Sequence, residues 1–286
     1  MLQRIVTGVI LAVVVVAAIW ISPPIIIAGL AAVVAILALV EFFDLGDRVG
    51  LKGFKKWSYV CTLLIFYAQY CTGHIQMHEF AGGVSVIRDA QGGFLSLEAA
   101  LLIFIFGCVC IGLATRRPLH EVFPAVSVSA GGILFVALPF SYVVRLNEIE
   151  VTGKQLLLFT LALVWAGDIL AYFVGKSLGR VPMAPALSPK KTSEGALGNV
   201  FASMITAVFF ARWMQIDVIT LVIIAAVANI AGQAGDLIES AYKRGSGVKD
   251  SGGLLPGHGG MLDRIDSLIL AVPVAWALYQ WLGHLR

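Results

Sequence analysis

Nine long apolar runs divide this chain, and they limit the folds open to it more than any other feature. Each run is close to the roughly 20 apolar residues that an α-helix needs to cross a bilayer core of about 30 Å. Of the 286 residues, 59% are hydrophobic and only 13% are charged, and the mean hydropathy is +0.92. The sequence therefore predicts an all-α polytopic membrane protein with about nine transmembrane helices. The expected spans are 5–22, 24–42, 57–72, 97–115, 121–144, 155–175, 196–213, 217–241 and 261–283.

The basic residues are distributed unevenly between alternate loops. If the nine spans are correct, fifteen of the 20 Lys and Arg residues lie on the side of the N-terminus, and five lie on the other side. Because Lys and Arg accumulate in cytoplasmic loops, this bias predicts a cytoplasmic N-terminus and a C-terminus on the outer side. The topology also accounts for the net charge of +3, so we expect no nucleic-acid partner.

The chain is interpreted as a single membrane domain, 1–286, whose two parts differ in character. Residues 1–150 hold few ionisable groups away from the ends of their apolar runs, so we expect mainly a helical scaffold. Glu41 and Asp44 come at the end of the second run, where we expect water among the headgroups to solvate them. Residues 155–286 place acids inside apolar runs and are expected to carry the catalytic helices and cytoplasmic loops.

The outer loop at 73–96 contains a possible but disfavoured metal site. His74 and His78 have the i, i+4 spacing of ligands on a helix, but no third ligand is nearby and the loop contains Gly-Gly twice. A flexible connector is the preferred interpretation. The four cysteines all lie in or beside apolar runs, where cysteine behaves as a small hydrophobic residue.

The sixth run contains an acid in its cytoplasmic half. Asp168 is followed by Lys176 two turns later. An acid inside a span costs about 2.5–3.5 kcal/mol on insertion scales, so such a residue usually faces a polar cavity. A local ion pair between Asp168 and Lys176 is the alternative.

The loop after this run has the composition of a phosphate site. The sequence "LSPKKTSEG" places Ser188, Lys190, Lys191 and Glu194 just before the seventh span. Free N–H groups and the dipole at a helix N-terminus add to the charge of the lysines. Ordinary cytoplasmic lysines beside a helix cap remain an equal alternative.

A polar stripe follows near the end of the eighth run. Asp236, Glu239, Ser240 and Lys243 recur at i, i+3, i+4 and i+7, so they share one helix face. Small residues nearby, including Gly232, allow close helix packing. A stripe this polar is expected to face protein rather than lipid.

The loop before the ninth run combines glycines with charges. Seven glycines between 245 and 260 give a backbone that can approach a ligand and offer its N–H groups. The charged or ionisable residues of this part of the chain are Arg244, Lys249, Asp250, His258, Asp263, Arg264 and Asp266. Ion pairs that only stabilise the loop are the alternative interpretation. Mg²⁺ favours one or two carboxylates together with substrate phosphates, which Asp236 and Asp263 on facing helices could supply.

These motifs resemble a known family. The sequence "SAYKRGSGVKDSGGLLPGHGGMLDRID", residues 240–266, resembles the signature of the phosphatidate cytidylyltransferases, or CDP-diglyceride synthetases. The blocks "GDILAYFVGKSLGR" and "LSPKKTSEG" are similar to family blocks in the expected order. The resemblance implies that CTP and phosphatidic acid give CDP-diacylglycerol and pyrophosphate, with Mg²⁺ at two divalent or mixed cation sites. It also implies a homodimer embedded among membrane lipids and active in phospholipid biosynthesis.

The resemblance also implies roles for individual residues. Asp236 and Asp263 would be metal ligands, with Asp266 as a third ligand or as support for them. Lys243 and His258 complete the expected catalytic set, with His258 donating to the leaving pyrophosphate. The residues expected to bind substrate are Asp168, Lys176, Ser188, Lys190, Lys191, Glu194, Ser240, Arg244, Lys249, Asp250 and Arg264.

Three other functions use similar chemistry. An ion-coupled transporter also carries acids in glycine-broken helices, but here the acids cluster toward one side. A CDP-alcohol phosphotransferase would need a D-G-x-x-A-R motif, which the sequence lacks. A polyprenol kinase is closer, since it uses a nucleoside triphosphate at the same interface. The compact length favours a bacterial inner-membrane protein with its active site facing the cytoplasm.

Overall fold

The computed structural model describes residues 2–73, 75–80, 83–88, 95–115, 118–254 and 259–283, and most of them are helical. The helices are α1 (Leu2–Ile21), α2 (Pro24–Arg48), α3 (Lys55–Gly73), α4 (Leu97–Ala114), α5 (Leu119–Gly132), the π-helical turn η1 (Ile133–Ala137), α6 (Leu138–Asn147), α7 (Gly153–Leu178), α8 (Ser193–Met214), α9 (Val218–Gly245) and α10 (Leu262–Gly283). Two antiparallel hairpins join them, β1 (Ile75–Phe80) with β2 (Gly83–Arg88) and β3 (Pro182–Ala184) with β4 (Ser188–Thr192). The helical class is thus confirmed, with the two hairpins as additions.

Side chains cap the first turns of α8 and α9. The Thr192 hydroxyl accepts a hydrogen bond from the Gly195 N–H at 3.1 Å and caps α8. Asp217 caps α9 in the same way through the Thr220 N–H at 3.0 Å. Side-chain oxygens in these positions satisfy N–H groups that have no partner within the helix. The predicted starts of these helices lie within a few residues of the observed ones.

The fifth predicted span is one continuous helical rod with an irregular centre. α5, η1 and α6 follow one another without a break from Leu119 to Asn147. Pro139 lies just after the π-helical turn. Its ring clashes with the carbonyl of the residue four positions earlier and it has no N–H to donate, so the helix widens locally instead of breaking.

The outer faces of the bundle are apolar. Phe106, Phe123 and Phe209 are 67%, 80% and 70% exposed, which would be costly in water and is expected against lipid. Among the described residues, seven helices are long and apolar enough to span a membrane. The other two predicted spans correspond to α1, which has a shorter apolar stretch at Ile10–Ile21, and to α3. The chain is an integral membrane protein, while the count of nine spans and the orientation of the termini stay predictions.

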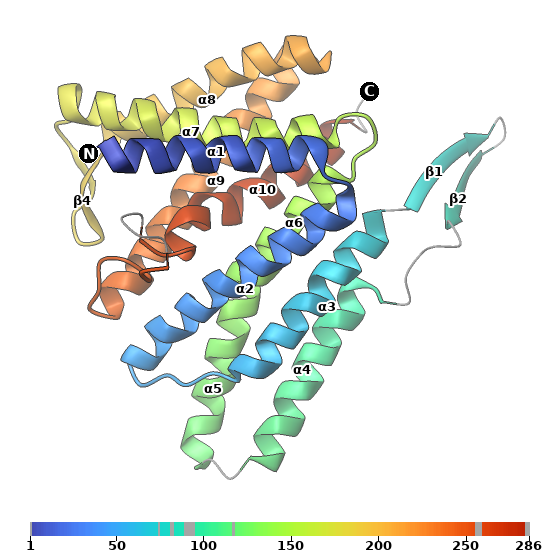
Figure 1. The fold of residues 1–286 in the computed structure, drawn as a ribbon, viewed down its shortest axis with the longest axis vertical. Coiled ribbons are helices and arrows are strands. Elements are labelled where there is room, and N and C mark those ends of the chain that lie inside the picture. Colours follow the sequence, from blue (N-terminus) through green and yellow to red (C-terminus); the bar gives the residue numbers. More distant parts are fainter. Residues whose placement is uncertain are drawn as a thin grey trace.

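The helices form two layers that meet at an angle (Figure 1). α7 packs along α8, and α9 packs along α10. α2, α3 and α4 run across the view at an angle to α1 and α7, with α6 in contact with α2, α3 and α10. The main core joins both layers, whereas a smaller core of residues such as Ile65, Phe104 and Ile133 lies among α3, α4 and η1.

The loops gather on two opposite sides of this bundle. The connections from α7 to α8 and from α9 to α10 lie on the same side as the start of α1 (Figure 1). The connections from α1 to α2 and from α6 to α7 lie on the opposite side. The two motif-bearing loops of the sequence are therefore neighbours in space, although about 60 residues separate them in the chain.

The loop at 73–96 differs from the flexible connector that we expected. Its residues 75–80 and 83–88 form the β1–β2 hairpin, in which His78 pairs across the strands with Ser85. The helical i, i+4 geometry does not apply to a residue in a strand. His74 lies outside the described residues.

Candidate active site

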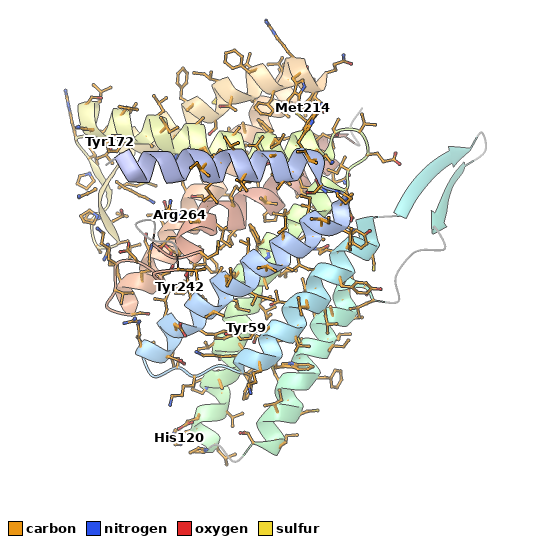
Figure 2. The ribbon with its side chains drawn as sticks, viewed as in Figure 1. Tyr59, His120, Tyr172, Met214, Tyr242 and Arg264 are labelled. Carbon is orange, nitrogen blue, oxygen red and sulfur yellow. The ribbon has the colours of Figure 1, made fainter. Side chains whose placement is uncertain are left out.

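A cavity of about 560 Å³ lies among α7, α8, α9 and α10 at the end near the β3–β4 hairpin. Tyr172, one of its lining residues, is at this end of α7 in Figure 2. The size is within the range of small-molecule sites, roughly 300–1,000 Å³. Seven of the predicted site residues line the cavity: Asp168, Lys176, Lys190, Lys191, Asp236, Asp263 and Asp266.

Glycines allow the helices of the site to approach closely. A Cβ added at Gly235 would lie 2.5 Å from the backbone oxygen of Asp266, so only glycine fits at this crossing of α9 and α10. A Cβ at Gly232 would lie 3.0 Å from the backbone oxygen of Ser267. The predicted small-residue packing is therefore present, and it brings the acids of the two helices together.

Three carboxylates meet where α9 and α10 cross. One oxygen each of Asp236, Glu239 and Asp266 lies within 4.8 Å of the other two. Glu239 is fully buried, with 0% of its surface exposed, and forms an ion pair with Lys243. Oxygen ligands of this kind fit a hard divalent cation, and like charges this close repel one another without one.

Glu239 is the member of this cluster that we did not include among the predicted site residues. The sequence placed it on the same helix face as Asp236, one turn away. The spacing is a sufficient signal for Glu239, whereas the family motif indicates Asp263.

Asp263 lines the cavity but has a different environment. Its Oδ1 accepts from Lys243 Nζ at 2.6 Å. Its Oδ2 accepts from the Ser251 N–H at 3.1 Å, from the Ser251 hydroxyl at 3.1 Å and from the Gly260 N–H at 2.8 Å. Protein donors thus satisfy a carboxylate that the motif predicts as a metal ligand.

Lysines of α7 and the β4 strand also border the cavity. Lys191 makes an ion pair with Asp236, across 45 residues of chain. Lys190 and Lys176 also line the cavity, and Lys176 Nζ lies 5.9 Å from the centre of the Tyr172 ring. Lysines of α7 and β4 therefore line the same cavity as the acids of α9 and α10, together with Asp168 of α7.

A network of amides fixes the acid of α7. Asp168 Oδ1 accepts from Asn199 Nδ2 at 3.2 Å, and Asn199 Oδ1 accepts from Asn229 Nδ2 at 2.5 Å. Gln233 Nε2 donates to Asn229 Oδ1 at 2.7 Å. The geometry favours this network over the local pair with Lys176 that we considered for Asp168. These amides are not among the predicted site residues, although polar amides inside apolar runs are a usable signal.

Other predicted residues lie around the cavity rather than on its wall. The Ser240 hydroxyl is 3.5 Å from Asp236 Oδ1. Glu194 accepts from the Val181 N–H at 3.3 Å and holds the hairpin. Arg244 donates to the backbone oxygens of Leu187 and Val248 at 3.2 and 3.3 Å.

The remaining predicted residues lie farther out. Ser188 is half-buried in β4, opposite Ala184. Lys249, Asp250 and Arg264 are exposed, and Figure 2 marks Arg264 at the start of α10. His258 lies outside the described residues.

Comparison with known proteins agrees with the motifs. The model of the cytidylyltransferase family matches residues 2–282. The phosphatidate cytidylyltransferase of Bacillus subtilis is 38% identical over 147 residues, which cover 51% of this chain and 55% of that protein. Its counterpart in Haemophilus influenzae is 47% identical over 127 residues, 42% of this chain and 44% of that protein.

A further relative is the uncharacterized protein YnbB of Escherichia coli, 46% identical over 123 residues, or 43% of this chain and 41% of that protein. The chain thus matches about half the length of these curated relatives. The resemblance that the motifs indicated is confirmed by these matches, and the relatives named phosphatidate cytidylyltransferase are by that name nucleotidyltransferases.

Proposed function

Because this chain belongs to the cytidylyltransferase family, we propose that it transfers the cytidylyl group of CTP to phosphatidic acid. The products are CDP-diacylglycerol and pyrophosphate, and the reaction serves phospholipid biosynthesis. The named activity of the Bacillus subtilis and Haemophilus influenzae relatives supports this choice.

The observation that carries the proposal is the pairing of opposite charges across one cavity. Lys176, Lys190 and Lys191 line the cavity from α7 and β4, and Asp236 and Asp266 line it from α9 and α10. A triphosphate needs the cations, but it would be repelled by bare carboxylates. A nucleotide bound together with a divalent cation satisfies both groups of side chains.

The reaction joins two phosphates at the membrane surface. A phosphatidate phosphate oxygen attacks the α-phosphorus of CTP and forms a new P–O bond. The bond from the α-phosphorus to the α,β-bridging oxygen breaks, and pyrophosphate leaves in line, taking the electron pair of that bond. The nucleophile is already anionic near neutral pH, so positioning and charge neutralisation account for the catalysis.

The acids of α9 and α10 are the proposed ligands of Mg²⁺. Asp236, Asp263 and Asp266 keep this role, and the geometry adds Glu239 to them. When bound, Mg²⁺ would neutralise triphosphate charge at this position. Two divalent or mixed cation sites remain part of the proposal.

The basic side chains are proposed to hold phosphates. Lys191 and Lys190 take CTP oxygens, since both come from the strand that borders the cavity. Lys176 holds the lipid phosphate from the end of α7. Lys243 stabilises Asp263 and Glu239, and His258 donates to pyrophosphate.

The outer group of polar residues completes the proposed site. Ser188, Glu194 and Arg244 hold the hairpin and the loop against each other. Ser240 supports Asp236. The exposed residues that we propose to meet the incoming nucleotide are Lys249, Asp250 and Arg264.

The proposed setting is the bacterial inner membrane, with the cavity facing the cytoplasm, where CTP is available. The basic loops around the cavity support this orientation. A homodimer is the proposed assembly.

An isotope experiment on the purified protein in detergent tests the function. With phosphatidate as acceptor, CTP labelled on its α-phosphorus should give a labelled lipid, and CTP labelled on its γ-phosphorus should give labelled pyrophosphate. A lipid kinase gives the opposite pattern, because it transfers the γ-phosphoryl group. A transporter labels no lipid with either nucleotide, so either of these patterns would contradict the proposal.

A further inference from the structure

Glu41 of α2 is buried against the active-site loop, far from its own part of the sequence. Only 6% of its surface is exposed, and α2 continues for two turns beyond it, to Arg48. We expected headgroup water to solvate this side chain, and that expectation is wrong. A buried carboxylate in an apolar helix needs partners, so its contacts indicate what it does.

The partners of Glu41 are donors at the start of α10. Its Oε1 accepts from the Met261 N–H at 2.9 Å, and its Oε2 accepts from the Leu262 N–H at 2.8 Å. Oε2 also accepts from the Ser251 hydroxyl at 2.8 Å. A carboxylate at a helix N-terminus satisfies free N–H groups and interacts favourably with the helix dipole. Here the carboxylate comes from a helix more than 200 residues earlier.

The same contacts reach Asp263. The Ser251 hydroxyl lies 2.8 Å from Glu41 Oε2 and 3.1 Å from Asp263 Oδ2, so its one hydrogen is shared between two carboxylates. The Gly260 N–H, next to the Glu41-bound Met261 N–H, donates to Asp263 at 2.8 Å. Glu41 and Asp263 therefore fix the same turn of backbone from its two sides.

Glycines of the motif make room for this arrangement. A Cβ added at Gly252 would lie 2.5 Å from Glu41 Oε1, and one at Gly260 would overlap Glu41 Oε2. Gly259, with φ +78°, would place a Cβ 2.7 Å from Asp263 Oδ2. We expected these glycines to let backbone approach a ligand, but at these three positions they admit carboxylates of the protein.

Other contacts hold α2 against the same loop. The Ser246 hydroxyl donates to the backbone oxygen of Leu45 at 3.0 Å. The Phe42 and Tyr242 rings meet edge to face, with their centres 5.5 Å apart. Glu41 is thus the polar centre of a contact that includes both ends of the α9–α10 loop.

We propose that Glu41 is a positioning residue for the cytidylyl transfer: it holds the first turn of α10 so that Asp263 faces the cavity. This inference rests on the proposed function, because Asp263 acts in that reaction. Glu41 touches no substrate and acts only through the Ser251 hydroxyl and the backbone of Gly260 to Leu262.

The test replaces Glu41 with Gln and uses Asp44→Asn as the matched control. The amide keeps the shape but offers only one acceptor oxygen, so its NH₂ group faces either the Met261 N–H or the Leu262 N–H. Asp44 lies one turn away on α2, is exposed, and pairs with Lys55 at 3.1 Å. Two measurements are made on each protein: hydrogen–deuterium exchange of peptides covering 259–266, and the steady-state kcat and KM for CTP.

For Glu41→Gln, we expect exchange in 259–266 to accelerate about tenfold while exchange in α2, in α9 and in the rest of α10 is unchanged. We expect kcat to fall about 10- to 100-fold with little change in KM, since the reacting groups are misaligned rather than lost. Asp44→Asn should match the wild type in both measurements.

Two results would overturn the positioning role. One is unchanged exchange at 259–266 together with a kcat within about twofold of the wild type. The other is faster exchange throughout α2, α9 and α10, which would make Glu41 only a stabilising residue. If the wild type itself transfers no cytidylyl group, the proposed function fails, and the exchange measurement alone decides whether Glu41 holds the start of α10.

Discussion

Asp263 and Asp266 lie one turn apart on α10, yet their carboxylates have opposite environments. Asp263 accepts from Lys243, from the Ser251 N–H and hydroxyl, and from the Gly260 N–H. Asp266 accepts from one donor, the Ser267 N–H at 2.6 Å, and one of its oxygens otherwise lies within 4.8 Å of oxygens of Asp236 and Glu239. One carboxylate is satisfied by four protein donors, and the other has a single backbone donor and two acidic neighbours.

The difference separates two ways in which an acid can serve a phosphoryl-transfer site. Donors from the protein fix the position of a carboxylate, so Asp263 is already in place before any ligand binds. Acids that crowd together are stable only when a cation or protons neutralise them, so the group of Asp266 is suited to recruit a metal. Lys243 contacts Asp263 and Glu239 and so links the two groups.

The largest effect is expected for Asp263→Asn. The amide cannot accept from all four donors, so the free energy of unfolding should fall by about 3 kcal/mol. Turnover with CTP and Mg²⁺ should be abolished in protein that still inserts into the membrane. Thermal unfolding and the α-labelled CTP assay measure the two quantities. Near-normal turnover would remove Asp263 from the site.

For Asp266→Asn we expect a loss of turnover without a loss of stability. Turnover should fall by about 10²- to 10³-fold, because the cluster loses a ligand. The unfolding midpoint should stay the same or rise, since the substitution removes charge repulsion. A clear loss of stability would mean that Asp266 is held by favourable contacts, and the contrast with Asp263 would not hold.

Substitutions of two lysines that line the cavity, Lys191 and Lys176, should have smaller effects that differ from each other. Lys191 pairs with Asp236, whereas Lys176 lies over the Tyr172 ring at the edge of the cavity. Lys191→Gln should raise the KM for CTP about tenfold. Lys176→Gln should change it less than about threefold and act mainly on the KM for phosphatidate. Equal effects on CTP would show that both lysines bind the nucleotide.

The sequence predicted what local patterns can encode. The apolar runs gave the helices to within a few residues at most ends, because length and hydropathy decide which segments can span a bilayer. The i, i+3, i+4, i+7 stripe placed Asp236, Ser240 and Lys243 on one face of α9, where the structure has them. Helical periodicity fixes a face without any knowledge of the fold.

The sequence did not predict contacts that depend on how distant helices pack. Nothing near Glu41 indicates a partner at Met261, and the polar link from Asp168 through Asn199 to Asn229 crosses three helices. The glycines show the same limit. Their number suggested a backbone that approaches a ligand, whereas in the fold Gly252 and Gly260 make room for the Glu41 carboxylate.

The smallest effect is expected for Mg²⁺ binding, which the unfolding midpoint measures in the variants of the two acids. A ligand that binds only the folded state stabilises it by mass action, with about 2.7 kcal/mol at 100 times its Kd. Millimolar Mg²⁺ should therefore raise the unfolding midpoint of the wild type by a few degrees, and EDTA should reverse this. Asp266→Asn should lose this shift, because Asp266 is one of the three clustered acids. Asp263→Asn should lose less of it, since one proposed ligand outside the cluster is removed while Asp236, Glu239 and Asp266 remain. Equal loss in both variants would mean that Asp263 binds the cation as directly as Asp266 does, and that its four donors only hold it ready for the metal.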